Sequence, residues 1–143
     1  MMRPHSPACL DVLIVDDNDM VRTDLRTLLT LIDGVRVTGE ASTASVAIQM
    51  AVKNQPDLLI LDLQLNVQGE ADLSGLTVLR TIKRMLPGCF IFVLTVHDYE
   101  QARREAFQAG ADRFFVKGRE SSGMFAAIHA LIQSKNNHFD SGV

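Results

Sequence analysis

The chain has 143 residues, of which 47% are hydrophobic and 22% are charged, and its formal net charge is −3 at pH 7. This length and balance fit one globular domain and exclude a disordered chain. The charge excludes a broadly basic nucleic-acid binder, although it leaves room for a local basic patch. No apolar run approaches the roughly 20 residues of a membrane span.

Residues 1–9 are short, contain proline and are not hydrophobic enough for a secretion signal, so we expect a cytoplasmic protein with no membrane contact. The two cysteines, Cys9 and Cys89, each precede an apolar run. In a reducing cytosol we expect both to be free thiols, partly buried beside those runs. Their surroundings do not resemble a zinc site.

Short apolar runs alternate with helical patterns in the first half of the chain. Residues 10–15 are apolar and β-branched and predict a strand, and residues 35–37 and 57–61 predict two more. Helical spacing over 21–32 predicts a first helix with one apolar face: Val21, Leu25, Leu28, Leu29 and Ile32. A second helix should begin after Thr43, whose hydroxyl can cap it, and end at Gln55-Pro56.

The second half repeats the alternation after a polar loop over 64–74. A third helix carries Leu79, Ile82 and Leu86, and residues 90–94 and 113–116 predict two strands. Between these strands we expect a helix capped by Asp98 and ended by Gly110. The last helix has an inward face of Met124, Phe125, Ile128, Leu131 and Ile132. Residues 136–143 read as a polar, frayed tail.

Strand and helix therefore alternate five times, which indicates an α/β fold. The first, third and fourth strands are apolar almost throughout, as expected when helices cover both faces of a parallel sheet. Right-handed crossovers then give an open, doubly wound sheet. Ligands of such sheets bind beyond the carboxyl ends of the strands, so chemistry is expected there.

Five polar residues stand at those strand ends: Asp16, Asp17, Asp62, Thr95 and Lys117. Three carboxylates held together repel one another unless a cation neutralises them, and Mg²⁺ is the cation that such oxygen ligands suit. A metal ion, an ammonium and a hydroxyl around one carboxylate meet the needs of phosphoryl transfer, in which a carboxylate can be the nucleophile. The pattern predicts a magnesium-dependent phosphoryl site.

Each of these residues has a simpler explanation when taken alone. Asp16 or Asp17 could cap the first helix, Thr95 could be structural, and Lys117 could be a solvated surface residue. Their joint placement at four strand ends of one predicted sheet favours the functional interpretation.

The segments at these positions resemble the signature segments of response-regulator receiver domains. They are Leu13-Ile14-Val15-Asp16-Asp17, Leu59-Ile60-Leu61-Asp62-Leu63, Val93-Leu94-Thr95 and Ala109-Gly110-Ala111-Asp112, followed by Val116-Lys117. The match covers roughly residues 10–134. It implies a five-stranded flavodoxin-like sheet of strand order 2-1-3-4-5, with a receiver domain over 10–135 between tails at 1–9 and 136–143.

The resemblance also implies a role for each site residue. Asp62 would accept a phosphoryl group from the phosphohistidine of a histidine kinase or phosphotransfer protein. Asp17 and Asp62 would ligate Mg²⁺, with Asp16 acting directly or through water and Gln64 offering its backbone carbonyl. Lys117 would pair with the phosphate and Thr95 would hydrogen-bond it. The protein is then expected to be a switch domain and not a turnover enzyme.

Phe114 occupies the aromatic switch position of the family. Phosphorylation adds negative charge and acceptor oxygens, so Thr95 would move toward them and vacate space for Phe114 to turn. The face formed by the fourth helix, fifth strand and fifth helix would then change its partner preference. The alternative for Phe114 is plain core filling. The chain is similar to receivers that precede helix-turn-helix domains. We therefore expect DNA contact only through an output domain absent from this sequence. We also expect homodimerisation on phosphorylation.

The sequence departs from the family pattern in two loops. Asn66 stands where proline is usual, and Gly75-Leu76, the expected entry to the third helix, comes late. Residues 66–73 therefore read as an insertion carrying Glu70 and Asp72, which either tunes the site or is a solvated loop. Elsewhere Gly118 replaces a common proline, so the cis bond that a Lys-Pro peptide would favour after Lys117 is not guaranteed. Val96 could restrict access to the phosphate, and the neighbouring His97 could be a pH-sensitive gate or an exposed residue.

Two other functions compete with the switch. One is a Mg²⁺-dependent phosphatase with an aspartyl-phosphate intermediate, which would need a second acid two residues after the nucleophile. Gln64 stands there and argues against it. The other is a receiver-like interaction domain that is never phosphorylated, and the complete acceptor set argues against that.

Overall fold

The computed structural model describes residues 9–65, 74–96 and 99–141, with side chains as far as Asn137. Its five strands form one parallel sheet in the order β2-β1-β3-β4-β5, which confirms the predicted fold class and strand order. The strands are β1 (Leu10–Val15), β2 (Val35–Ala41), β3 (Leu58–Leu61), β4 (Phe90–Thr95) and β5 (Arg113–Val116). The helices are α1 (Asp19–Thr30), α2 (Ala44–Asn54), α3 (Gly75–Met85), α4 (Glu100–Ala109) and α5 (Ser121–Ser141).

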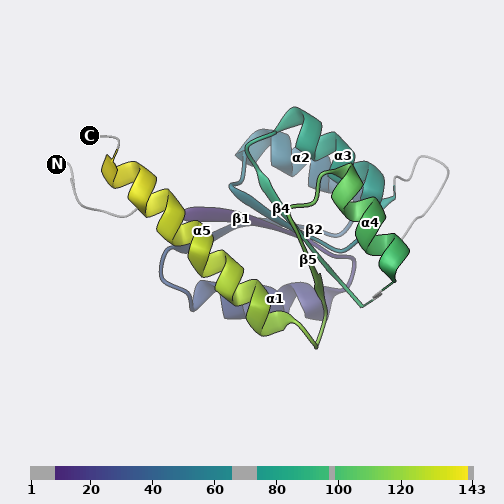
Figure 1. Cartoon of the computed structure of the whole chain (residues 1–143). Helices are drawn as coiled ribbons and strands as arrows, with labels where there is room; N and C mark the ends of the chain where they lie inside the picture. The colour runs from purple at the N-terminus through teal and green to yellow at the C-terminus, as the bar shows by residue number, and fades with distance from the viewer. Residues whose placement is uncertain (1–8, 66–73, 97–98, 142–143) are drawn as a thin grey trace.

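Helices cover both faces of the sheet and divide the core into two clusters. Figure 1 shows α1 and α5 on one face and α2, α3 and α4 on the other. Successive residues of a strand point to opposite faces, so Leu13 and Leu59 enter one cluster while Ile14 and Ile60 enter the other. This two-sided burial is the reason that the central strands are apolar at nearly every position.

Capping residues set the starts of the helices. Asn18 caps α1 by accepting a hydrogen bond from the Val21 amide at 3.1 Å, so neither Asp16 nor Asp17 has that role. Thr43 caps α2 as predicted. The residue before α4 is Tyr99, which makes no side-chain capping bond; the predicted cap, Asp98, lies outside the described residues.

Two elements are longer than the sequence predicts. β2 continues to Ala41 because Gly39, Glu40 and Ala41 pair with β1 through the backbone after a register shift between Val12 and Leu13. A hydrophobicity pattern does not detect such pairing. α5 continues through residues 136–141, which were expected to be a frayed tail. That stretch is polar but contains no proline or glycine that would stop a helix. The division into a domain over 10–135 and two tails stays a prediction.

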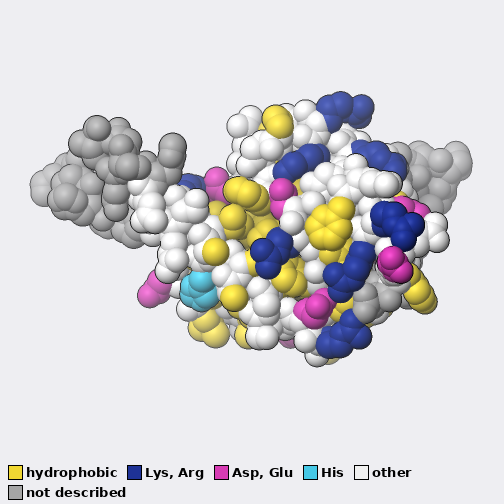
Figure 2. Space-filling model, viewed as in Figure 1, with side chains coloured by type: hydrophobic (Ala, Val, Ile, Leu, Met, Phe, Trp, Pro, Cys, Tyr) yellow, Lys and Arg dark blue, Asp and Glu magenta, His cyan; other side chains and the backbone are white. Residues whose placement is uncertain are grey.

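The charges at the surface, the character of the helices and the state of the cysteines can be compared with what the sequence predicts. On the face shown in Figure 2, basic and acidic side chains are interspersed. Among the described residues, no helix combines the length and the apolar character that crossing a bilayer requires. Cys9 and Cys89 are free, as expected, and Cys89 is buried, but Cys9 is exposed and the expectation that it would be partly buried was wrong. Burial raises the pKa of the Cys89 thiol to about 12, which keeps it protonated and unreactive.

Gly75, the first residue of α3, packs directly on the backbone that follows Asp62. A Cβ atom at this position would lie 2.5 Å from both Cα and the carbonyl oxygen of Leu63. Gly75→Ala should therefore lower the free energy of unfolding by about 1–3 kcal/mol, as overpacking against rigid backbone does. Urea denaturation would measure the change.

Gly88→Ala is the matched control, since a Cβ there meets no atom within 4 Å. Its unfolding free energy should stay within about 0.5 kcal/mol of the wild type. Equal stability of the two variants would contradict the close contact between Gly75 and Leu63.

Candidate functional site

Adjacent strands bring Asp16 and Asp62 to one edge of the sheet. Val15 at the end of β1 pairs with Leu61 at the end of β3, so the acids that follow them are neighbours. The backbone ladder continues one residue further, because the Asp62 amide donates to the Val15 carbonyl at 2.9 Å and the Asp16 amide donates to the Ala41 carbonyl at 3.0 Å. Both acids therefore stand on fixed backbone.

Asp16, Asp17 and Asp62 form one carboxylate cluster. One oxygen atom from each lies within 4.8 Å of the other two. Asp16 is 2% exposed and Asp62 is 6% exposed, whereas Asp17 is half-buried. Hard oxygen ligands at this spacing suit a divalent cation such as Mg²⁺, which is typically held by one or two carboxylates and several waters. The convergence predicted from the strand ends is thus confirmed for these three residues.

Lys117 joins the cluster from the end of β5. Its Nζ atom donates to Oδ2 of Asp16 at 2.7 Å and to Oδ2 of Asp62 at 2.9 Å. Its backbone amide donates to the Thr95 carbonyl at 2.8 Å, which continues the β4–β5 ladder. The next residue, Gly118, has φ = +77°, a conformation that a proline could not adopt. The described residues contain no cis peptide bond.

Burial and the contacts within the cluster shift two pKa values. Burial raises the pKa of Asp62 and outweighs the hydrogen bonds from the Gln64 amide and from Lys117, which lower it. Burial alone would lower the pKa of Lys117, but its hydrogen bonds to Asp16 and Asp62 outweigh burial and raise that pKa. Lys117 is therefore held as a cation, and it neutralises only part of the charge of three carboxylates.

Short-range backbone bonds orient the two buried carboxylates. The Asn18 amide donates to Oδ1 of Asp16 at 2.9 Å, and the Gln64 amide donates to Oδ1 of Asp62 at 2.9 Å. Each acid thus accepts one bond from an amide two residues later and another from Lys117. The predicted role of Gln64, a backbone carbonyl that ligates a metal, stays a prediction.

Thr95 and Phe114 lie inward on neighbouring strands. Thr95 is 1% exposed at the end of β4, and Phe114 on β5 belongs to the core cluster beneath α4. The guanidinium of Arg103 stands 4.7 Å from the centre of the Phe114 ring and 3.2 Å from Glu120, which also accepts from the Val116 amide at 2.9 Å. The inward position of Phe114 is thus covered by an ion pair between α4 and the loop after β5.

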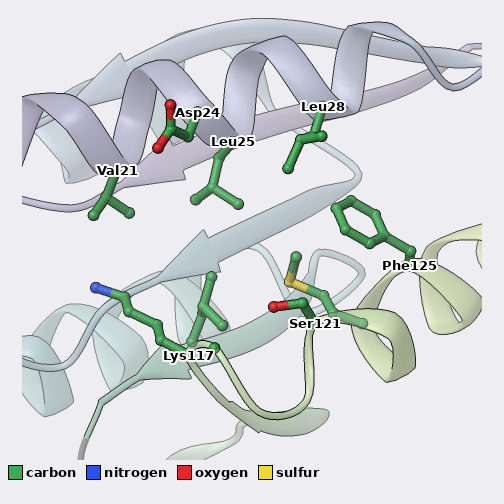
Figure 3. Close-up of a pocket in the computed structure, with 10 residues that line it drawn as sticks. Val21, Asp24, Leu25, Leu28, Lys117, Ser121 and Phe125 are labelled. Atoms are coloured by element: carbon green, nitrogen blue, oxygen red, sulfur yellow. The ribbon is translucent and has the colours of Figure 1, made fainter.

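An apolar groove of about 240 Å³ separates α1 from α5 beside the site. Figure 3 shows Val21, Leu25 and Leu28 facing it from α1 and Phe125 from α5, with the Lys117 side chain at one end. The aliphatic stem of Lys117 is therefore packed while its amino group reaches the carboxylates.

Some predicted residues lie outside the described part of the chain: Asn66, Glu70, Asp72 and His97, together with the rest of the 66–73 loop. Val96 is described and is 61% exposed, so its side chain lies at the surface. Two residues at the site were missed by sequence reasoning. Asn18 is a common capping residue directly before the apolar pattern of α1 and could have been found by that signal. Arg22 donates to the Asp16 carbonyl, and no pattern in the sequence indicates this contact.

A doubly wound sheet of order 2-1-3-4-5 with three acids and a lysine at its carboxyl edge defines a receiver-like α/β domain. The family model for the response regulator receiver domain matches residues 12–129. The chain belongs to this family, whose members are signalling switches and not turnover enzymes.

Curated relatives include the response regulator UvrY of Escherichia coli K12, which is 31% identical over 122 residues, or 85% of this chain and 54% of UvrY. The nitrate/nitrite response regulator NarL of the same strain is 31% identical over 118 residues, or 82% of this chain and 52% of NarL. The chain thus spans about half the length of these relatives.

Solved structures give the same result. The chain is similar to a LuxR-family response regulator from Aurantimonas sp. SI85-9A1, with a TM-score of 0.77 and 27% identity over 92% of this chain and 89% of that one. It is also similar to the isolated receiver domain of RcsB from Salmonella enterica, solved with the phosphomimetic BeF₃⁻, with a TM-score of 0.79 and 26% identity over 90% and 91%. The relatives therefore belong to regulators of the LuxR and NarL type.

Proposed function

We propose that this domain is a phosphorylation-controlled switch in which Asp62 accepts a phosphoryl group from a histidine kinase or a phosphotransfer protein. The observation that carries the proposal is the contact of Lys117 with Asp16 and Asp62 inside a cluster of three carboxylates. This set supplies a nucleophile, a cation and an acidic metal site within one hydrogen-bonded group. The membership of the chain in the receiver family supports the same conclusion.

In the proposed step, a carboxylate oxygen of Asp62 attacks the phosphorus of a phosphohistidine. A P–O bond forms, the P–N bond breaks, and the imidazole nitrogen leaves with the electron pair. Asp16, Asp17 and Asp62, with the Gln64 carbonyl, would hold Mg²⁺, which supplies positive charge to the phosphoryl oxygens. Lys117 keeps its charge because its pKa is raised, and it would pair with an oxygen of the new acyl phosphate.

The output of the switch rests on Thr95 and Phe114. A phosphoryl group on Asp62 would attract the Thr95 hydroxyl and leave room for Phe114 to turn. The Arg103–Glu120 pair over the Phe114 ring would then have to rearrange, and this would alter the face formed by α4, β5 and α5. Such a change could act through protein contacts, homodimerisation or a DNA-binding output domain, as the likeness to LuxR-type regulators suggests. We place the switch in the cytoplasm, in a domain over residues 10–135.

The test is incubation of the chain with Mg²⁺ and acetyl phosphate, followed by intact-mass analysis. The wild type should gain one phosphoryl group, while Asp62→Asn and wild type in excess EDTA should gain none. In the phosphorylated sample, the NMR signals of the Phe114 ring should move, and in Asp62→Asn they should not.

The outcomes separate the competing functions. Absence of any adduct from both acetyl phosphate and a phosphorylated kinase would reject the switch in favour of an unphosphorylated interaction domain. Release of many phosphates from a phosphoester per chain would instead indicate the phosphatase.

A further inference from the structure

Arg22, on the first turn of α1, contacts the loop after β1, its own helix and β2 through its guanidinium group. Its Nη1 atom donates to the backbone carbonyl of Asp16 at 2.5 Å. Its Nη2 atom pairs with the Asp19 carboxylate at the start of α1, and Nε lies 3.4 Å from Oε1 of Glu40 on β2. The Arg22 side chain is only 14% exposed, so it is held within the structure at the base of the site.

The contact with the Asp16 carbonyl matters because that carbonyl belongs to the peptide joining Asp16 to Asp17. A peptide group is planar, so fixing its oxygen fixes the plane from which both side chains depart. The amide of Asp16 is already held by the Ala41 carbonyl on β2. Because Arg22 donates a hydrogen bond to the oxygen of the next peptide, hydrogen bonds hold the backbone on both sides of the Asp16 Cα atom.

We propose that Arg22 is a positioning residue that orients the Asp16–Asp17 peptide and thereby sets the Mg²⁺ affinity of the carboxylate cluster. This inference rests on the proposed function, because it assumes that the cluster binds Mg²⁺. Arg22 acts through the backbone, and Glu40 and Asp19 hold its guanidinium in place. The planar, three-sided guanidinium reaches three acceptors at once, which the point charge of a lysine does not reproduce.

The test compares Arg22→Lys and Arg22→Ala with a matched control, Arg26→Ala. Arg26 pairs with the same Glu40 but is 49% exposed and lies further along α1. MgCl₂ would be titrated into the ¹⁵N-labelled full chain while NMR follows the amides of the cluster. Urea unfolding without Mg²⁺ would measure the stability of each variant.

Both Arg22 variants should weaken Mg²⁺ binding roughly tenfold, the usual effect of losing a group that orients a metal ligand. Arg26→Ala should change the affinity less than about twofold, because an exposed ion pair contributes little. If Arg22→Lys bound Mg²⁺ as tightly as the wild type, the proposal would be overturned, even if the variant were less stable. A purely structural role predicts lower stability with unchanged Mg²⁺ affinity. If Arg22→Ala does not fold, Arg22→Lys decides. A wild type that binds no Mg²⁺ would reject the proposed function as well.

Discussion

Lys117→Ala is expected to slow phosphorylation of Asp62 by acetyl phosphate roughly a hundredfold, the usual cost of removing one donor to a developing oxyanion. Without Mg²⁺ it should also lower the free energy of unfolding by about 2 kcal/mol, less than for a fully buried pair because the Lys117 side chain is 18% exposed. The reason is that Lys117 is the hydrogen-bonded cation of the Asp16 and Asp62 carboxylates. Intact-mass time courses and urea denaturation would measure the two effects.

Lys135→Ala is the control for this prediction. Lys135 also forms a lysine–aspartate pair, at 2.7 Å with Asp57, but at the amino edge of the sheet. Its removal can change stability and should leave the phosphorylation rate unaltered. Added Mg²⁺ should raise the free energy of unfolding more in Lys117→Ala than in the wild type, because the ion replaces the missing positive charge. If Lys117→Ala were phosphorylated at the wild-type rate, Lys117 would have no role in the mechanism.

Asp62→Asn is expected to stabilise the metal-free protein at neutral pH by about 1 kcal/mol, the size of an ordinary single substitution. Burial raises the pKa of Asp62 in the folded chain above its value in the unfolded chain. The contribution of Asp62 to stability is therefore fully present below the unfolded pKa and is lost as pH rises through the folded pKa. Asparagine carries no charge, so it avoids that loss.

Urea unfolding of wild type and Asp62→Asn in EDTA, across a pH series, would measure this effect. The advantage of asparagine should be largest near neutral pH and should shrink as the pH falls below the folded pKa of Asp62. Asp24→Asn is the matched control, because it removes one charge from an exposed position on α1. A gain in Asp62→Asn that is independent of pH would show that charge burial is not its cause.

The fold could be predicted because the sequence carries the burial pattern of a two-faced sheet. β3 is apolar at all four positions, and each of its residues enters one of the two core clusters. The edge strand β2 carries a weaker signal: half-exposed polar residues take part in its pairing, so only its first residues were predicted. A hydrophobicity pattern indicates which residues are buried. An edge strand can pair through its backbone while few of its side chains are buried, so its pairing leaves a weak pattern.

The acidic cluster could be predicted for a related reason. Parallel strands end at the same edge, so acids directly after β1 and β3 must be neighbours once the order is right. Arg22 could not be placed in this way. A long side chain on a helix can reach several elements, and which one it contacts depends on the distance and tilt of α1 against the sheet. Sequence periodicity contains no information on that geometry.

The C-terminal part of α5 differs from the rest of the helix in its support. Among the described side chains, Ile132 is the last of α5 to enter the core, and Figure 1 shows the helix continuing past the edge of the sheet to Ser141. Helical segments shorter than about 12 residues are only marginally stable in water without tertiary packing. The last turns of α5 should therefore unfold locally at a lower free energy than the buried core.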